Sequence, residues 1–429
     1  MVYIFIILCF YSVLISYYIY KDIINPSFLL SFFWMILAIF ASFCFYGLYP
    51  ATDKSYITCC IGVLFFTIGN LISNSFCKKK KLKFGKLNDS YVRNKHSFSK
   101  KRFRIIVIIM LLFCLVRFKT VLSMLRAGYS LDMIRLVYFG YNVGGYGFSE
   151  FMSIIELFIH LPLLYASMAI ISYNLALPKR EKYIDSFTQI IALIWILFAQ
   201  IITGGRMTLY IFGIEIFISY LIVNHYTIVN IKEFFQNHIK LIFFILCLVM
   251  IVYQLSLGRK NTDTYDVMKA LYVDFCGSFT HMGLRFKQVD FEQYTYGLSL
   301  LSGFLRPLML VIKYTLGKFP YLYQITIDIG NILQTPIMIG TNIETNAYVF
   351  PVFYFYYDGG FIGVLIDSLI CGIVSGKIYY NANKSDNLYD NAIYLLIIYG
   401  ICTSFIRYSG NLVYYALAFF MMRIFFKNK

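Results

Sequence analysis

Apolar positions fill long uncharged runs along most of the chain, and short polar segments separate these runs. A run of about 18 residues or more is long enough to cross a bilayer as a helix. The pattern predicts eleven spans, at residues 2–20, 28–48, 56–77, 105–125, 151–173, 184–203, 207–224, 240–257, 361–380, 391–406 and 411–426. We therefore expect an all-α, polytopic integral membrane protein whose 429 residues form a single membrane domain.

The basic residues indicate which loops face the cytoplasm. Residues 78–104 hold 12 of the 38 lysines and arginines, and loops rich in these residues stay inside. Alternation of the spans then places the C-terminus inside, the N-terminus outside and the long interval 258–360 outside. Under this topology 23 basic residues lie inside and 15 outside, which agrees with the assignment.

Composition excludes several other classes of protein. The chain is 60% hydrophobic and only 14% charged, and its net charge of +17 is concentrated in one loop. This placement favours contact with anionic lipid over a nucleic-acid partner. The cysteines lie mostly inside spans without paired metal spacing, so we expect neither a disulfide framework nor a zinc site.

Two apolar stretches of the long interval do not read as ordinary spans. Residues 296–316 are interrupted by Arg306, Pro307 and Lys313, so an interfacial or re-entrant helix is expected there. Residues 346–357 are too short to cross the bilayer. We expect them to form a helix that enters the outer leaflet and stops at Asp358-Gly359-Gly360.

Ionisable residues inside spans are functional hypotheses by default, with pairing to another helix as the alternative. Glu215 and Asp367 belong to this group. Arg117 is instead expected to reach the outer surface with its long side chain. His160 is expected to be structural.

The outside interval limits the chemistry, because nucleotide sugars and ATP are cytoplasmic. A lipid-linked diphosphate is the energy-rich donor expected on that face, and arginines or a metal would stabilise its leaving group. The candidate arginines are Arg206 in Thr203-Gly204-Gly205-Arg206, with Arg135, Arg259, Arg285 and Arg306. Asp290-x-Glu292 offers a metal alternative, but exposed acidic pairs are usually solvated surface, so we expect no metal and no cofactor.

Motifs around residue 344 resemble a known family. Asn342-x-Glu344-Thr345-Asn346-Ala347-Tyr348, then Phe353-Tyr354-x-Tyr356-x-Asp358-Gly359-Gly360-x-x-Gly363, with Gly204-Gly205-Arg206, resemble the Wzy-type polymerases of O-antigen and capsule repeat units. The resemblance implies a fold akin to the C-type glycosyltransferases in a bacterial plasma membrane. It also implies undecaprenyl-diphosphate-linked oligosaccharides as substrates and a chain-length regulator as a partner.

Arg206, Glu344 and Asp358 are predicted to be catalytic, while the predicted substrate-binding residues are Arg135, Arg259, His281, Arg285, Arg306, Asn346 and Tyr348. Arg206 is expected to share one outward-facing cavity with Glu344 or Asp358. Two alternatives remain open, which are a flippase or other transporter of lipid-linked oligosaccharide and an O-antigen ligase.

Overall fold

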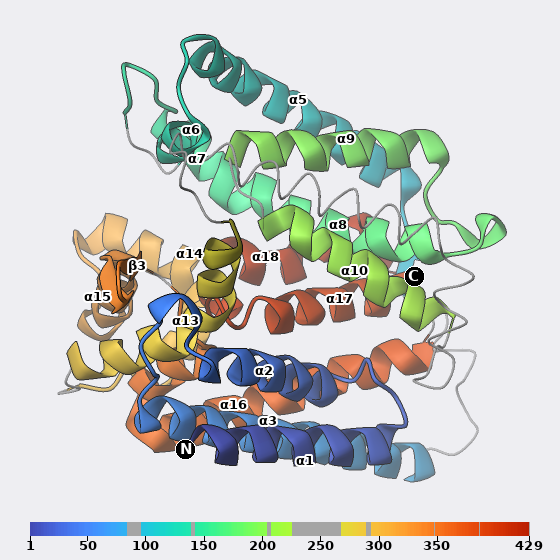
Figure 1. The fold of residues 1–429 in the computed structure, drawn as a ribbon. Coiled ribbons are helices and arrows are strands. Elements are labelled where there is room, and N and C mark those ends of the chain that lie inside the picture. Colours follow the sequence, from blue (N-terminus) through green and yellow to red (C-terminus); the bar gives the residue numbers. More distant parts are fainter. Residues whose placement is uncertain are drawn as a thin grey trace. The chain divides into compact units, whose positions relative to one another are not determined.

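The computed structural model describes residues 1–83, 96–138, 142–203, 207–224, 267–288, 293–346, 348–385 and 387–428 (Figure 1). Contacts divide the chain into two units. The first unit is Met1–Asp89, Met268–Ser385 and Ile397–Ala416, and the second is Ser90–Val267, Asp386–Leu396 and Leu417–Lys429.

The first unit contains helices from the N-terminal part of the chain and from its last third. They are α1 (Val2–Tyr20), α2 (Pro26–Ser42), α3 (Asp53–Lys83), α13 (Val267–Gln288), α14 (Leu298–Leu316), α15 (Tyr321–Gln334) and α16 (Pro351–Ser385). Strands β2 (Ile337–Gly340) and β3 (Ile343–Thr345) pair as an antiparallel hairpin, and 3-10 turns lie at Phe45–Gly47 and Ser409–Asn411. Helix α17 (Leu388–Cys402) passes from the second unit into the first at Ile397.

The second unit is built from the middle of the chain and its C-terminus. Its helices are α5 (Lys100–Arg126), α6 (Leu131–Tyr138), α7 (Glu150–Ile155), α8 (Leu161–Ala176), α9 (Ser186–Thr203), α10 (Met207–Val223) and the greater part of α18 (Val413–Met421). Residues Glu156–His160 form a π-helical segment between α7 and α8, and 3-10 turns lie at Lys179–Glu181 and Met422–Phe425. Strands β1 (His96–Phe98) and β4 (Phe426–Asn428) pair antiparallel.

The expectation of a mostly helical membrane protein is confirmed. Within the described residues, seven helical stretches are long and apolar enough to cross a bilayer, at 2–20, 53–76, 100–126, 150–176, 186–203, 298–316 and 351–385. Shorter apolar helices lie at 26–42, 208–223, 388–402 and 413–425. Helix α14 is among the long ones, although Arg306 and Pro307 favoured an interfacial or re-entrant helix. The expected span at 240–257 lies outside the described residues, so eleven spans remain a prediction.

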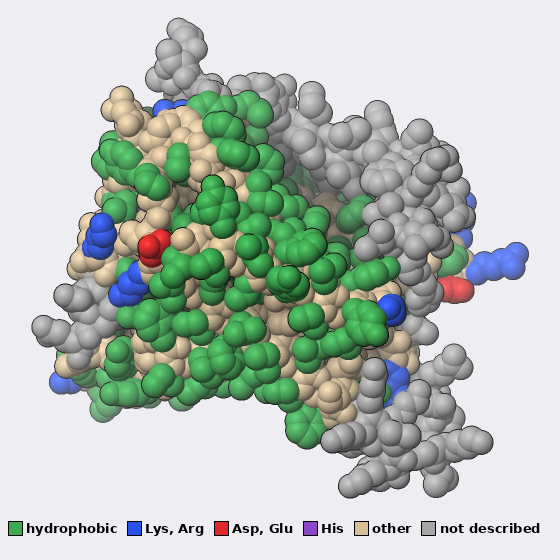
Figure 2. All heavy atoms as spheres, turned by 60° about the horizontal axis from the view of Figure 1, so that its bottom comes forward, with side chains coloured by type: hydrophobic (Ala, Val, Ile, Leu, Met, Phe, Trp, Pro, Cys, Tyr) green, Lys and Arg blue, Asp and Glu red, His purple; other side chains and the backbone are tan. Residues whose placement is uncertain are grey.

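One face of the first unit is a broad apolar surface. Figure 2 shows hydrophobic side chains across the face that α1 and α16 present, with charged side chains towards its edges. On α1 the exposed side chains include Tyr3, Ile7, Leu14 and Tyr18, and on α16 they include Ile362, Ile366, Ile370 and Val374. An apolar surface of this kind suits contact with lipid chains.

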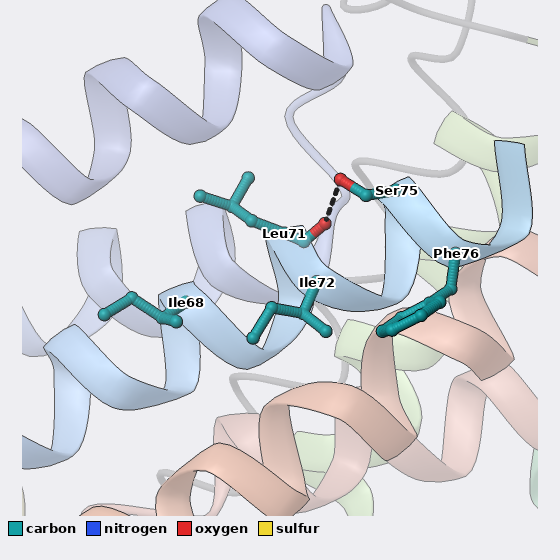
Figure 3. Close-up of a pocket in the computed structure, with 5 residues that line it drawn as sticks. All are labelled: Ile68, Leu71, Ile72, Ser75 and Phe76. Atoms are coloured by element: carbon teal, nitrogen blue, oxygen red, sulfur yellow. Dashed lines mark hydrogen bonds between the residues drawn. The ribbon is translucent and has the colours of Figure 1, made fainter. Parts of the chain in front are cut away.

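A shallow depression on α3 belongs to the same kind of surface. It has a volume of about 270 Å³ and is lined by Ile68, Leu71, Ile72, Ser75 and Phe76 (Figure 3). Its one hydroxyl, on Ser75, donates to the Leu71 carbonyl of its own helix at 3.1 Å. Among the described residues that line it, the depression therefore offers apolar side chains and a hydroxyl that is already bonded within α3.

Helices α3 and α16 run side by side (Figure 1) and approach each other closely through glycines. A Cβ on Gly69 would lie 2.3 Å from the Leu369 carbonyl oxygen, and one on Gly372 would lie 2.2 Å from the Phe66 carbonyl oxygen. Small residues allow this approach in membrane helices, where packing replaces the hydrophobic effect as the source of association. The pair fixes the part of α16 that follows the candidate site.

Candidate functional site

The candidate site lies in the first unit, where the chain passes from β3 into α16. Helix α16 begins at Pro351 and is interrupted at Gly359 and Gly360 before it continues to Ser385. Gly360 has φ of 63°, and a Cβ there would lie 3.0 Å from the Tyr294 hydroxyl. Only glycine takes this conformation without strain. The interruption turns the side chain of Asp358 towards α14.

Asp358 caps the N-terminus of α14. Its Oδ1 accepts the Ser299 backbone N–H at 2.9 Å and the Thr295 hydroxyl, and its Oδ2 accepts the Leu300 backbone N–H at 2.8 Å. The side chain is buried, and Asp367 further along α16 is hydrogen-bonded to it. Carboxylates stabilise the free N–H groups at a helix start. The contacts of Asp358 are thus structural, and its predicted catalytic role remains a prediction.

His281 and Arg285 form a buried pair on α13. Arg285 Nε donates to His281 Nε2 at 3.0 Å, so the imidazole proton lies on Nδ1, which donates to the Tyr348 carbonyl at 2.7 Å. Burial, opposed in part by the hydrogen bond to Tyr348, and the neighbouring Arg285 lower the pKa of His281 to about 4. Histidine is therefore neutral here at pH 7, and its basic nitrogen is occupied.

Most of the N–H groups of the Arg285 guanidinium are hydrogen-bonded within the protein. Besides His281, it donates to Gln288 at 2.7 Å, to the Thr335 hydroxyl at 3.3 Å and to the Thr335 carbonyl. Four of its five N–H groups are thereby engaged, and its side chain is 1% exposed. Burial lowers the pKa of this guanidinium. Arg285 joins α13 to the end of α15, and little of it remains available to a diphosphate.

The stability of the first unit is expected to fall as the pH drops from 6.5 to 4. In this range the unfolded chain binds a proton at His281 and the folded chain does not, because the folded pKa is about 4. The difference from the ordinary value of about 6.5 is worth up to about 3 kcal/mol. Thermal unfolding of the purified protein in detergent would measure it. The His281→Asn variant should show a flatter pH profile, and an unchanged profile would contradict this assignment.

The remaining predicted residues of the first unit lie in different surroundings. Glu344 is exposed on β3, opposite Met338, and its carboxylate makes no hydrogen bond or ion pair within the described chain. Asn346 is half-buried and donates to the Gln334 carbonyl at 3.0 Å. The guanidinium of Arg306, within α14, lies 5.3 Å from the centre of the ring of Phe319, in the turn between α14 and α15. Of these side chains, Glu344 alone presents an unoccupied carboxylate to solvent.

Arg407, which is not among the predicted site residues, lies in the short loop between α17 and α18. Its side chain is half-buried, and its electrostatic neighbours are the hydroxyls of Tyr414, Tyr354, Tyr399 and Tyr348. Within the described residues it has no acidic partner. A half-buried guanidinium among neutral phenols retains its full charge and its donors for an anion. The signal available in the sequence was an arginine between two apolar helices in a tyrosine-rich segment.

The loop that carries Arg407 is held against the start of α16. The Val349 backbone N–H donates to the Ile406 carbonyl at 3.0 Å, and the Tyr408 hydroxyl donates to the Leu300 carbonyl at 3.1 Å. These contacts place Arg407 beside Tyr348, four residues after Glu344 in the chain. The loop, the start of α14 and the start of α16 thus support one site.

The other predicted arginines do not join this site in the described structure. Arg135 lies on α6 in the second unit, where it is half-buried. Arg206 and Arg259 lie outside the described residues, as do Asp290 and Glu292. The expected cavity that Arg206 shares with Glu344 or Asp358 therefore stays a prediction. Among the described residues, no group of three side chains suited to a metal ion is found.

The second unit contains a separate buried ionic cluster. Arg117 Nη1 lies 2.6 Å from Glu156 Oε2, and the same oxygen lies 2.8 Å from His160 Nδ1. The Trp195 indole N–H donates to His160 Nε2 at 2.9 Å, so the imidazole proton lies on Nδ1, facing Glu156. Arg117 is 2% exposed, so the expectation that it reaches the outer surface is wrong. It turns inward because Glu156, in the π-helical segment, faces it.

Removal of one partner of this cluster is expected to destabilise the protein strongly. Glu156→Leu would leave the buried Arg117 without a counter-ion, at a cost of about 3–5 kcal/mol. In the double variant Arg117→Met/Glu156→Leu no charge is left unpaired, so most of the loss should be recovered. Thermal unfolding of the purified variants would show this. Additive losses in the double variant would contradict the pairing.

Three side chains of the first unit could take part in chemistry at the candidate site: the half-buried Arg407, the exposed Glu344 and the capping Asp358. No protein-family model, no curated protein and no solved structure matches the chain.

Proposed function

We propose that this chain is a metal-independent polymerase of lipid-linked oligosaccharide repeat units, acting on the extracytoplasmic face of a bacterial plasma membrane. The observation that supports this most is Arg407, a half-buried arginine among tyrosines, without an acidic partner in the described residues. It lies beside the segment whose motifs resemble the repeat-unit polymerases. Such a group suits a diphosphate, and tyrosine rings suit sugar faces.

The reaction would be a glycosyl transfer between two lipid-linked glycans. A hydroxyl at the non-reducing end of the new repeat unit attacks the anomeric carbon of the growing glycan. A new glycosidic bond forms, the bond from that carbon to the diphosphate breaks, and undecaprenyl diphosphate leaves with the electron pair. Arg407 would stabilise the charge on the leaving group, and Glu344 would accept the proton of the hydroxyl. Arg206 remains a second candidate for the diphosphate.

Glu344 is preferred to Asp358 as the base because of their contacts. The Asp358 carboxylate already accepts two backbone N–H groups and a hydroxyl, so both of its oxygens are engaged within the protein. Glu344 is exposed and carries no such bonds within the described chain. Asp358 would instead hold α14 in place beside the site.

A transporter of lipid-linked oligosaccharide is the second candidate. The buried cluster of Arg117, Glu156 and His160 favours it, because ionisable residues inside membrane helices often mark a transport path. The cluster is closed by its own ion pairs and aromatic neighbours, with Phe148 4.1 Å from the Arg117 guanidinium. This closure weakens the transport interpretation.

Deletion of the gene in its host distinguishes the candidates. A polymerase deletion should leave single repeat units on the lipid carrier, accessible to an impermeant glycosidase on intact spheroplasts. A transporter deletion should leave the same units protected until the membrane is permeabilised. A ligase deletion should leave long polymer on the carrier. Either of the last two results would overturn the proposed function.

A further inference from the structure

A depression of about 550 Å³ lies in the second unit, whereas the residues of the candidate site belong to the first. It is lined by Arg102, Arg423, Phe426 and Lys427. Arg102 lies in the first turn of α5, Arg423 in the 3-10 segment after α18, and Lys427 in β4. Three cationic side chains from three elements therefore surround one depression, and no carboxylate of the described residues lines it.

The strand pair β1–β4 brings these elements together. Ser97 pairs with Lys427 and Phe98 with Phe426, and the Ser99 backbone N–H donates to the Phe425 carbonyl at 2.9 Å. The pairing joins the end of the basic loop to the C-terminus, which the charge pattern places on the same, cytoplasmic face. The depression thus depends on backbone pairing between segments that are distant in sequence.

The floor of the depression is apolar and firmly packed. Phe426 is 6% exposed, and its ring centre lies 5.5 Å from that of Phe98 and 5.1 Å from that of Tyr389. The side chains of Arg102, Arg423 and Lys427 are exposed around it. None of the three has an ion pair within the described residues, whereas the neighbouring Arg104 is held by Asp185 at 2.8 Å. The three cations are thus available to an anion.

An exposed apolar strip on α5 leads away from the depression. Its side chains share the face of Arg102 at helical spacing, and they are Ile105 (46% exposed), Ile109 (51%), Leu112 (57%) and Val116 (58%). The strip runs along a helix long and apolar enough to cross a bilayer. A ligand that carries both a phosphate and hydrocarbon chains would occupy the depression and the strip together.

We infer that the depression binds the headgroup of an anionic phospholipid of the cytoplasmic leaflet, with the acyl chains along the exposed strip of α5. The three cations would contact the phosphate oxygens, and Phe426 would support the glycerol and first methylenes. The strip favours a lipid over a soluble phosphate, since a soluble ion makes no use of it. A basic pocket at the cytoplasmic ends of membrane helices is suited to this ligand class.

Binding of spin-labelled or fluorescent phosphatidylglycerol to the full-length protein in phosphatidylcholine nanodiscs tests the inference. The triple variant Arg102→Gln/Arg423→Gln/Lys427→Gln should bind about 100-fold more weakly, the sum of three contacts of about 1 kcal/mol each. The matched control is Lys179→Gln/Arg180→Gln/Lys182→Gln, which removes the same charge from the 3-10 turn after α8 and from the residue that follows it. It should bind as the unchanged protein does.

A single variant and a competition with inorganic phosphate test the same site in two other ways. If the triple variant does not fold, Lys427→Gln alone should weaken binding about 5-fold, the effect of one contact of about 1 kcal/mol. Inorganic phosphate at millimolar concentration should not displace the lipid. Equal binding by the triple variant and the control would overturn the site. Displacement by phosphate as effective as by unlabelled lipid would show a site for phosphate alone and overturn the lipid assignment.

Discussion

Arg407→Lys is expected to stop polymer formation almost as completely as Arg407→Ala, with a loss of about 100- to 1,000-fold in rate. In the proposed reaction the planar guanidinium would bind two diphosphate oxygens through parallel hydrogen bonds, and the ammonium of lysine cannot reproduce this geometry. Glycan profiles of a deletion strain carrying each variant would measure the effect. Single repeat units in place of a ladder are the expected product.

The control for this prediction is Arg285→Lys. Arg285 is buried and hydrogen-bonded to His281, Gln288 and Thr335, so its replacement should lower the amount of folded protein. Arg407 is half-buried among tyrosines, so its replacement should leave that amount unchanged. Full-length polymer from the Arg407→Lys strain would show that only the positive charge of this residue matters. That result would remove the main support for the proposed site.

Glu344→Gln is expected to reduce polymer formation by about 100-fold or more, because a general base contributes about that factor. Glutamine keeps the size and exposure of the side chain but cannot accept the proton. Asp358→Asn is the matched comparison. Its single amide oxygen can accept either the Ser299 or the Leu300 N–H group, and its NH2 group would face the other, so α14 should keep part of its cap.

The two carboxyl variants give different outcomes if Glu344 is the base. Glu344→Gln should accumulate single repeat units at normal protein levels, while Asp358→Asn should still yield polymer. The reverse result, with polymer from Glu344→Gln and none from a well-folded Asp358→Asn, would identify Asp358 as the general base. Gel profiles of the glycan and immunoblots of the membrane fraction, read together, separate these cases.

The helices could be predicted from the sequence because apolar runs of bilayer length have few alternatives. The expected span at 2–20 corresponds to α1, and that at 184–203 to α9 within two residues. Helix α16 begins ten residues before its expected span and includes the short apolar stretch before Gly359. The run at 361–380 predicted the helix after the glycines, but it could not show that this helix continues directly from the stretch before them.

The site was less predictable because partners decide what a polar side chain does. Asp358 and Arg285 looked available in the sequence, but each is engaged by residues distant in the chain, such as Leu300 for Asp358 and Thr335 for Arg285. Arg117 looked close enough to the surface to reach it, and a π-helical turn brings Glu156 to it instead. Arg407 could not be predicted as a site residue, because only the three-dimensional structure shows that no acidic side chain of the described residues pairs with it.

The pairing of β1 with β4 has a practical consequence for topology mapping. Reporter enzymes are commonly fused to successively truncated chains, and every truncation before residue 426 removes the strand that pairs with His96–Phe98. Such a fusion reports on a protein whose basic loop has lost its C-terminal partner. Reporters inserted into the intact chain would keep the last strand and so follow the native insertion. Affinity tags placed after Lys429 would similarly need a spacer, because Asn428 is already part of the strand pair.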